Sequence, residues 1–193
     1  MSYQTYITEA VVCGSQVSNT SDKSFLLFTR EAGMLWATAR SVREEKSKQR
    51  HALQDFSLIR VSLVKGKSGW RIGSVEALGN SFMESNAREA RAGSAYLVKL
   101  IRRYVHGESA LPDVFTDLLT ALTLAKNADT EKREAALAVF HVRLLARLGY
   151  VAGSAELTPL IEDTFINAID TMTPALFARI TIATKAASAA SHL

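Results

Sequence analysis

The spacing of apolar residues changes once along this chain, near residue 82, and this change restricts the fold more than any other feature. Between Thr5 and Phe82, apolar residues alternate with polar ones or form short runs, as they do in β-strands. From Ser85 onward they recur every three or four positions, as on one face of an α-helix. The order predicts an α+β multi-domain protein, with a strand domain at residues 1–82 and a helical domain at residues 83–193.

Five strands are predicted in the first domain. The glycines of Gly66–Gly69 favour a tight hairpin between the last two, because glycine adopts positive φ without strain. A flat sheet of five short strands would expose two edges, whereas a closed barrel exposes none. We therefore predict a five-stranded OB-fold β-barrel. The expected strands are Thr5–Val17, Ser24–Thr29, Met34–Arg40, Phe56–Lys65 and Trp70–Leu78.

Five helices are predicted in the second domain, and they are expected to pack together because a lone amphipathic helix cannot bury its apolar stripe. Gly149 is a stop signal for the third of them, and Asp129 or Thr130 can cap its start. The expected helices cover about 86–106, 113–127, 130–148, 159–171 and 174–187.

The positive charge of the chain is concentrated in the first domain. Residues 1–80 contain 11 Lys and Arg against 7 Asp and Glu, while residues 81–193 contain 12 of each, so the formal net charge of +4 comes from the first 80. A polar segment between the third and fourth strands, the basic loop, holds most of this charge. Cations on a small barrel suit the phosphate backbone of a nucleic acid. The predicted DNA contacts of the loop are Arg40, Arg43, Lys46, Lys48, Arg50 and the adjacent His51.

Further DNA contacts are predicted on the barrel itself. Trp36 and Arg40 share one face of the third strand, where an aromatic ring beside an arginine could stack on bases; the alternative is that Trp36 caps the barrel core. Three cations, Lys65, Lys67 and Arg71, cluster at the hairpin, either as a DNA contact or as ordinary surface charge. Trp70 and Phe28 are predicted to belong to the core.

A peptide-binding groove is predicted on the third helix. Arg143 and Arg147 flank an apolar stripe that contains Phe140 and Leu144. Two guanidiniums beside an apolar groove suit an acidic peptide with a hydrophobic end. The alternative is that these arginines only cover the edge of the core with their aliphatic stems.

The sequence has no recognisable catalytic or metal-binding motif, so we predict neither an enzyme nor a cofactor. The single cysteine, Cys13, lies in an apolar run and is expected to be a buried structural thiol. No apolar run approaches the roughly 18 residues of a membrane span, and the amino terminus lacks the pattern of a signal peptide. We therefore expect a cytoplasmic protein without membrane contact.

Four strings together resemble the family of the bacterial DNA repair and recombination mediator RecO. Thr8–Val12 and Leu27–Leu35 are similar to the opening strands of the family, Ser47–Leu58 to its basic loop and the following strand, and Phe140–Tyr150 to a helix that ends in Leu-Gly-Tyr. The resemblance covers residues 3–150. Two departures are the polar turn Ser18–Asp22, which lacks the usual glycine, and residues 149–159, which lack the cysteines of a zinc site, so no zinc is expected.

The resemblance implies an OB-fold followed by a helical domain. It implies binding of single- and double-stranded DNA without base specificity, and annealing of complementary strands. It also implies contact with the acidic tail of single-stranded-DNA-binding protein and with RecR, in order to help load a recombinase. Two alternatives stay open on the residues alone: a protein-interaction scaffold whose barrel does not bind DNA usefully, and an RNA-binding OB-fold.

Overall fold

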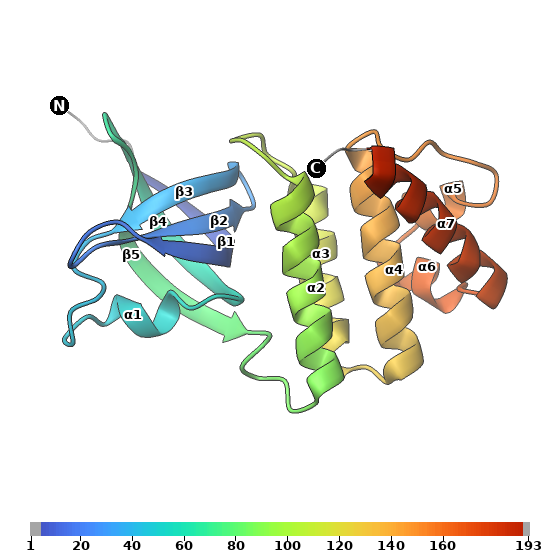
Figure 1. The fold of residues 1–193 in the computed structure, drawn as a ribbon, viewed down its shortest axis with the longest axis horizontal. Helices are drawn as coiled ribbons and strands as arrows, with labels where there is room; N and C mark the ends of the chain where they lie inside the picture. The colour runs from blue at the N-terminus through green and yellow to red at the C-terminus, as the bar shows by residue number, and fades with distance from the viewer. Residues whose placement is uncertain (1–4, 191–193) are drawn as a thin grey trace. The chain divides into compact units, whose positions relative to one another are not determined.

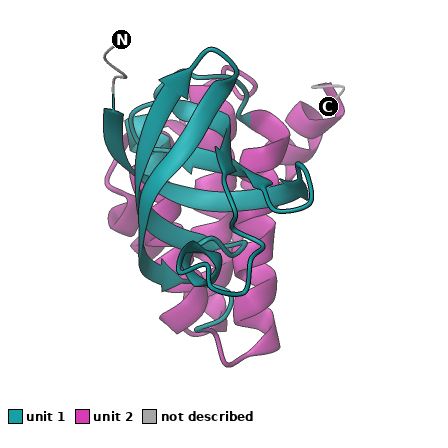
Figure 2. Ribbon diagram, turned by 90° about the vertical axis from the view of Figure 1, so that its left-hand side faces the viewer, with its two compact units in different colours: residues 1–84, 105–115 teal, residues 85–104, 116–193 magenta. Residues whose placement is uncertain are grey.

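The chain forms two compact units in a computed structural model, which describes residues 5–190 (Figure 1). The barrel unit comprises the chain up to Glu84 together with Val105–Phe115, and the helical unit comprises Ser85–Tyr104 and the chain from Thr116 on (Figure 2). The barrel unit is therefore discontinuous in sequence. The predicted division into domains at residues 1–82 and 83–193 stays a prediction.

The barrel unit contains five strands that close on themselves in the order β1-β2-β3-β5-β4. All neighbouring strands are antiparallel except β3 and β5, which pair in parallel through Ala37–Trp70 and Thr38–Arg71. The predicted OB-fold barrel is confirmed. The strands are β1 (Thr5–Val17), β2 (Lys23–Thr29), β3 (Gly33–Ala39), β4 (Ser57–Gly66) and β5 (Gly69–Asn80), and the short helix α1 (Gln49–Ala52) precedes β4.

Alternate residues of the strands fill the barrel, as the period of two requires. Phe25, Leu27, Ile59 and Leu63 are among its fully buried side chains. The sequence-based assignments of Phe28 and Trp70 to the interior are confirmed, since they expose 0% and 9% of their surface. Cys13 is buried as predicted and lies where the register of β1 against β2 shifts.

A segment that connects two helices packs on the barrel and is here called the strap, residues 105–115. The Phe115 ring lies 5.6 Å from that of Phe28, and the Gly107 carbonyl accepts a 2.9 Å hydrogen bond from the Met34 backbone. Gly33 makes this approach possible: a Cβ there would lie 2.3 Å from the Ser109 carbonyl oxygen, and its φ of 64° favours glycine. The sequence pattern did not predict the strap.

The helical unit is arranged around one long central helix, α4, which contacts α2, α5, α6 and α7. Gly93 permits close packing here, because a Cβ at this position would lie 3.3 Å from the Ala125 Cβ. No described helix is long and apolar enough to cross a membrane. The helices are α2 (Arg88–Tyr104), α3 (Pro112–Asn127), α4 (Thr130–Arg147), α5 (Thr158–Glu162), α6 (Phe165–Asp170) and α7 (Pro174–Ala190).

The prediction of one helix over 159–171 is wrong, because the chain breaks between α5 and α6. Asp163 is extended, with a ψ of 177°, and the Thr164 hydroxyl then caps α6 by accepting a hydrogen bond from the Asn167 backbone. The break frees two backbone carbonyls, and Arg143 donates to both of them, at Leu160 and Asp163. A buried guanidinium thus compensates for the hydrogen bonds lost at the break.

Candidate nucleic-acid interface

The polar turn Ser18–Asp22 fixes the start of the basic loop. The Asn19 side chain accepts hydrogen bonds from the Ser21 and Asp22 backbones, so it shapes the turn without a glycine. The Asp22 carboxylate then accepts a 2.8 Å hydrogen bond from the backbone of Ser41, whose φ of 49° is left-handed. This bond, the Asn19 amide and the nearby Arg40 charge lower the pKa of Asp22, which keeps the carboxylate ionised.

Arg43 connects the basic loop to the same turn. Its guanidinium donates to the carbonyls of Asn19 and Thr20, both at 3.0 Å, and its backbone donates to the Ser21 carbonyl. Carbonyl oxygens orient the guanidinium but carry no net charge that would cancel it. This positioning role of the turn was not predicted from the sequence, although Asn and Asp in a short polar turn are a recognisable signal for it.

The end of the basic loop is fixed by α1 and by Phe56. The Gln49 side chain, at the start of α1, donates a 2.6 Å hydrogen bond to the Gly73 carbonyl of β5. Phe56 has a left-handed φ of 71°, its backbone donates to the Val12 carbonyl, and its ring stacks on Phe82 at 4.8 Å. The loop is therefore held to the barrel at both ends.

Two clefts beside the basic loop bring predicted contacts together. One, of about 320 Å³, is lined by Arg40 and Arg71 together with Gln49. The other, of about 430 Å³, is lined by Arg43 and Arg50, with Asp55 as its one acidic member. The remaining predicted loop contacts line neither cleft but lie exposed: these are Lys46, Lys48 and His51.

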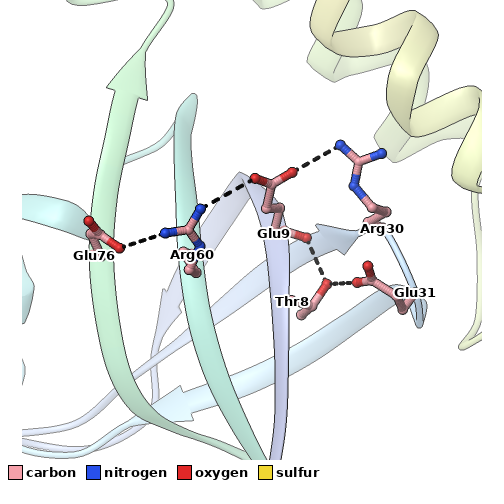
Figure 3. A network of polar contacts seen from close by, with 6 residues as sticks. All are labelled: Thr8, Glu9, Arg30, Glu31, Arg60 and Glu76. Atoms are coloured by element: carbon pink, nitrogen blue, oxygen red, sulfur yellow. Dashed lines mark hydrogen bonds and ion pairs between the residues drawn. The ribbon is translucent and has the colours of Figure 1, made fainter.

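The loop cations lie outside the ion pairs of the barrel, although the Asp22 carboxylate lies near Arg40 and two glutamates, Glu44 and Glu45, belong to the same loop. Within residues 5–190, no carboxylate forms an ion pair with Arg40, Arg43, Lys46, Lys48 or Arg50. Elsewhere on the barrel, Glu76, Arg60, Glu9 and Arg30 form an alternating row across β5, β4 and β1 (Figure 3). The distances along the row are 3.2, 3.9 and 2.9 Å, so its charges cancel.

Near this row, the Thr8 hydroxyl lies between the Glu9 carbonyl and the Glu31 carboxylate (Figure 3). The charged groups of this part of the barrel are therefore already in contact with each other. The five cations of the basic loop, in contrast, take part in no such ion pair among the described residues.

Trp36 lies on the outer face of β3 and exposes 45% of its surface, so it does not cap the barrel core. Thr38 follows on the same face, bonded to the Ser24 hydroxyl at 3.0 Å and aligned with Arg71 of β5. An accessible indole on the outer face of a barrel strand is what stacking on bases requires.

The three cations predicted at the hairpin have different environments. Lys65 forms a 2.8 Å ion pair with Glu108 of the strap, so its charge is already offset. Lys67 is exposed, while Arg71 is half-buried, lies against Gly66 and lines the cleft with Arg40.

The predicted groove on α4 is not formed, which corrects the sequence-based expectation. Phe140, Arg143 and Leu144 are buried, with at most 3% of their surface exposed. Asp117 of α3 explains the difference, because its carboxylate lies 3.5 Å from Arg143 and 3.4 Å from the partly exposed Arg147. The arginines are thus engaged inside the helical unit, and binding of an acidic peptide by these residues stays a prediction.

Known families match two successive parts of the chain. Residues 1–80 match the family described as recombination protein O N terminal, and residues 86–152 match recombination protein O C terminal. The chain belongs to the RecO family. No group of three or more His, Cys, Asp or Glu side chains among the described residues of this RecO-family chain is placed to hold a metal ion.

Curated relatives carry the same name. DNA repair protein RecO of Dehalococcoides mccartyi is 27% identical over 143 residues, which cover 74% of this chain and 56% of the relative. The protein of that name from Desulfitobacterium hafniense is 30% identical over 148 residues, covering 75% and 52%. That from Symbiobacterium thermophilum is 29% identical over 146 residues, covering 75% and 57%. The RecO-family chain spans about half the length of the curated relatives it matches.

Proposed function

We propose that this chain is a non-enzymatic recombination mediator that binds single- and double-stranded DNA through its barrel and anneals complementary strands in the bacterial cytoplasm. Membership of the RecO family supports a role in DNA repair and recombination. The observation that carries the proposal is the set of five loop cations that form no ion pair among the described residues, on a loop beside two clefts of a closed barrel.

The proposed mechanism is charge neutralisation. Arg43 and Arg50 line a cleft on the barrel and would fix the course of the backbone, while exposed Lys46 and Lys48 are long enough to follow different strand geometries. Cations that contact phosphates lower the repulsion between two strands and so permit pairing. Because the proposed contacts are to phosphates and to the faces of bases, sequence specificity is not expected.

Trp36 would add base stacking to this electrostatic contact. Its exposed ring offers a surface on which any base can stack, worth about 1–3 kcal/mol per base. In the proposed complex, Trp36→Phe keeps most of the affinity for single strands, because its ring can still stack. Trp36→Ala should lose the stacking contribution.

Further partners are proposed from family membership. These are the acidic tail of single-stranded-DNA-binding protein and RecR, through which the chain would help load a recombinase. Arg147 keeps part of its surface exposed beside Asp117 and can meet an acidic tail without rearrangement of the helical unit. Arg143 would have to leave its partners first.

The test is the triple variant Lys46/Lys48/Arg50→Ala. Loss of three single-strand phosphate contacts should make the slope of log affinity against log salt concentration shallower by about 2. It should also lower the affinity roughly 100-fold at 0.1 M salt. Annealing of complementary oligonucleotides should fall with it. Affinity is measured by fluorescence anisotropy at several salt concentrations.

The matched control removes three exposed cations from α2, Arg88, Lys99 and Arg102, and so changes net charge equally. This control should keep its affinity within a few-fold. Equal loss in both triple variants would show that only net charge matters, and unchanged affinity in the loop variant would exclude the proposed interface.

A further inference from the structure

Three side chains of the barrel unit meet where the β4–β5 hairpin faces the strap. The Glu108 carboxylate accepts a 2.8 Å hydrogen bond from Lys65 Nζ and a 2.9 Å hydrogen bond from Trp70 Nε1. One carboxylate oxygen contacts the ammonium and the other contacts the indole. An anion bound by a cation and a second donor in this way resembles a protein-bound phosphate group.

The two donors are held in place independently of Glu108. Lys65 and Trp70 are paired across the β4–β5 ladder, and Lys65 Nζ also lies 4.9 Å from the centre of the indole ring. The Tyr6 ring packs edge-on against the same indole at 5.5 Å. Because Trp70 is buried, its N–H requires an acceptor at this position whether or not Glu108 provides it.

Glu108, in contrast, can leave by rotation of its side chain. The strap is anchored next to it by the Gly107 carbonyl and further along by Phe115, so the backbone need not move. About half of the side-chain surface of Glu108 and of Lys65 is exposed, and an ion pair so accessible to water is weakly held. Both hydrogen bonds lower the pKa of Glu108, as expected for a site that favours an anion.

We propose that Lys65 Nζ and Trp70 Nε1 form an anion site for one backbone phosphate of a bound nucleic acid, and that Glu108 occupies this site in the free protein. The inference rests on the proposed DNA binding and adds that Glu108 lowers the affinity for DNA by competing for the site. On binding, the phosphate replaces the carboxylate, keeps the indole N–H bonded and releases Glu108 to water.

This exchange has a consequence for the salt dependence of binding. A phosphate contact normally steepens the slope because it releases condensed counterions. When Glu108 is displaced, however, the freed carboxylate recruits a cation, so the contact with Lys65 contributes little to the slope. Removal of the Glu108 charge should restore the missing contribution.

The test uses the full chain and the variant Glu108→Gln, whose amide oxygen can still accept from Trp70 but does not offset Lys65. A fluorescent oligothymidylate should bind roughly fivefold more tightly at 0.1 M salt, with a slope steeper by about 0.7. In the double variant Lys65→Gln/Glu108→Gln, which lacks the ammonium, most of this gain over wild type should disappear.

The matched control is Glu76→Gln, which removes one exposed carboxylate from the same barrel in the row around Arg60. It should change affinity by less than about twofold, because a charge distant from the contact is screened by salt. Equal gains in Glu108→Gln and Glu76→Gln overturn the anion site.

A second measurement separates this inference from the proposed function. The indole N–H resonance of Trp70, assigned by its persistence in Trp36→Phe, should shift when the oligothymidylate binds, and at lower concentration in Glu108→Gln. If the oligonucleotide binds while this resonance stays unchanged, the anion site is wrong and DNA binding stands. If neither protein binds it, both proposals are wrong.

Discussion

His141 is a titratable residue that the helical unit keeps neutral. Its Nδ1 shares a 2.8 Å hydrogen bond with the Tyr96 hydroxyl, and its Nε2 is buried without a hydrogen-bond partner among the described residues. Burial, and secondly the charge of Arg103, lower the pKa of His141 from 6.5 to about 4. The folded protein therefore disfavours the imidazolium that the unfolded chain readily forms.

This lowered pKa predicts a pH-dependent stability. Between pH 6.5 and about 4 the unfolded chain binds more protons at His141, so the free energy of unfolding falls as pH falls through this window. Allowing for partial solvent screening, we expect a loss of about 1–2 kcal/mol. Urea unfolding of wild type and His141→Gln across this window measures it. Parallel pH profiles for the two proteins would contradict the prediction.

Asp117 is the counter-charge that allows Arg143 to be buried. Its carboxylate lies 3.5 Å from Arg143, and removing one member of a buried ion pair leaves the other without compensation. We expect Asp117→Asn to lower the free energy of unfolding by about 3 kcal/mol, as measured by urea denaturation.

The control for Asp117 is the double variant Asp117→Leu/Arg143→Met, which replaces both charges by apolar groups. It should recover much of the lost stability, since the desolvation cost of the charges is removed as well. A loss below about 0.5 kcal/mol for Asp117→Asn alone would mean that the Leu160 and Asp163 carbonyls suffice for Arg143.

At the scale of elements, hydrogen bonds connect the turn Ser18–Asp22 to the basic loop, so the two segments depend on each other. Asp22→Ala removes the acceptor of the Ser41 backbone N–H, whose left-handed conformation then has no support. We expect faster hydrogen exchange at the Ser41 and Arg43 amides, together with DNA binding weakened about 3- to 10-fold. Asn19→Ala should have a similar effect, whereas Ser18→Ala should not. Unchanged exchange rates would mean that α1 alone holds the loop.

Local patterns predicted most elements well because their cause is local. Alternation predicted the ends of β1, β2 and β4 to within one or two residues, and the helical period predicted α2, α3 and α4. The break between α5 and α6 was missed, since it depends on Arg143, which lies far away in sequence. For the same reason Arg143 was predicted to flank an open groove. Its contact with Asp117 depends on the packing of α4 against α3, which the period of one helix does not contain.

For the whole molecule, the segregation of charge predicts a steep salt dependence. If the loop cations neutralise about 4–6 phosphates of a single strand, the log–log slope should be roughly −3 to −4. A threefold rise in salt should then weaken binding by tens of fold, as measured by anisotropy of the full chain. A slope near zero would favour the scaffold alternative.

The candidate interface was predictable at this scale only in part. The excess of cations in the first 80 residues can be counted in the sequence, and it indicated the basic loop. The pairing of Lys65 with Glu108 could not be anticipated, because they lie 43 positions apart in a stretch that includes the whole of α2. Only folding shows which cations are offset and which stay free.

The strap also determines where the barrel can be cut. Phe28 is shielded by Phe115, and Met34 is bonded to Gly107, although both partners are encoded more than 70 positions later. A gene fragment that stops at residue 82 would therefore encode a barrel in which the Phe28 ring is uncovered and Glu108 is absent from the site formed by Lys65 and Trp70. Such a fragment should aggregate more readily than the full chain. Its affinity for polyanions would therefore not represent that of the whole protein.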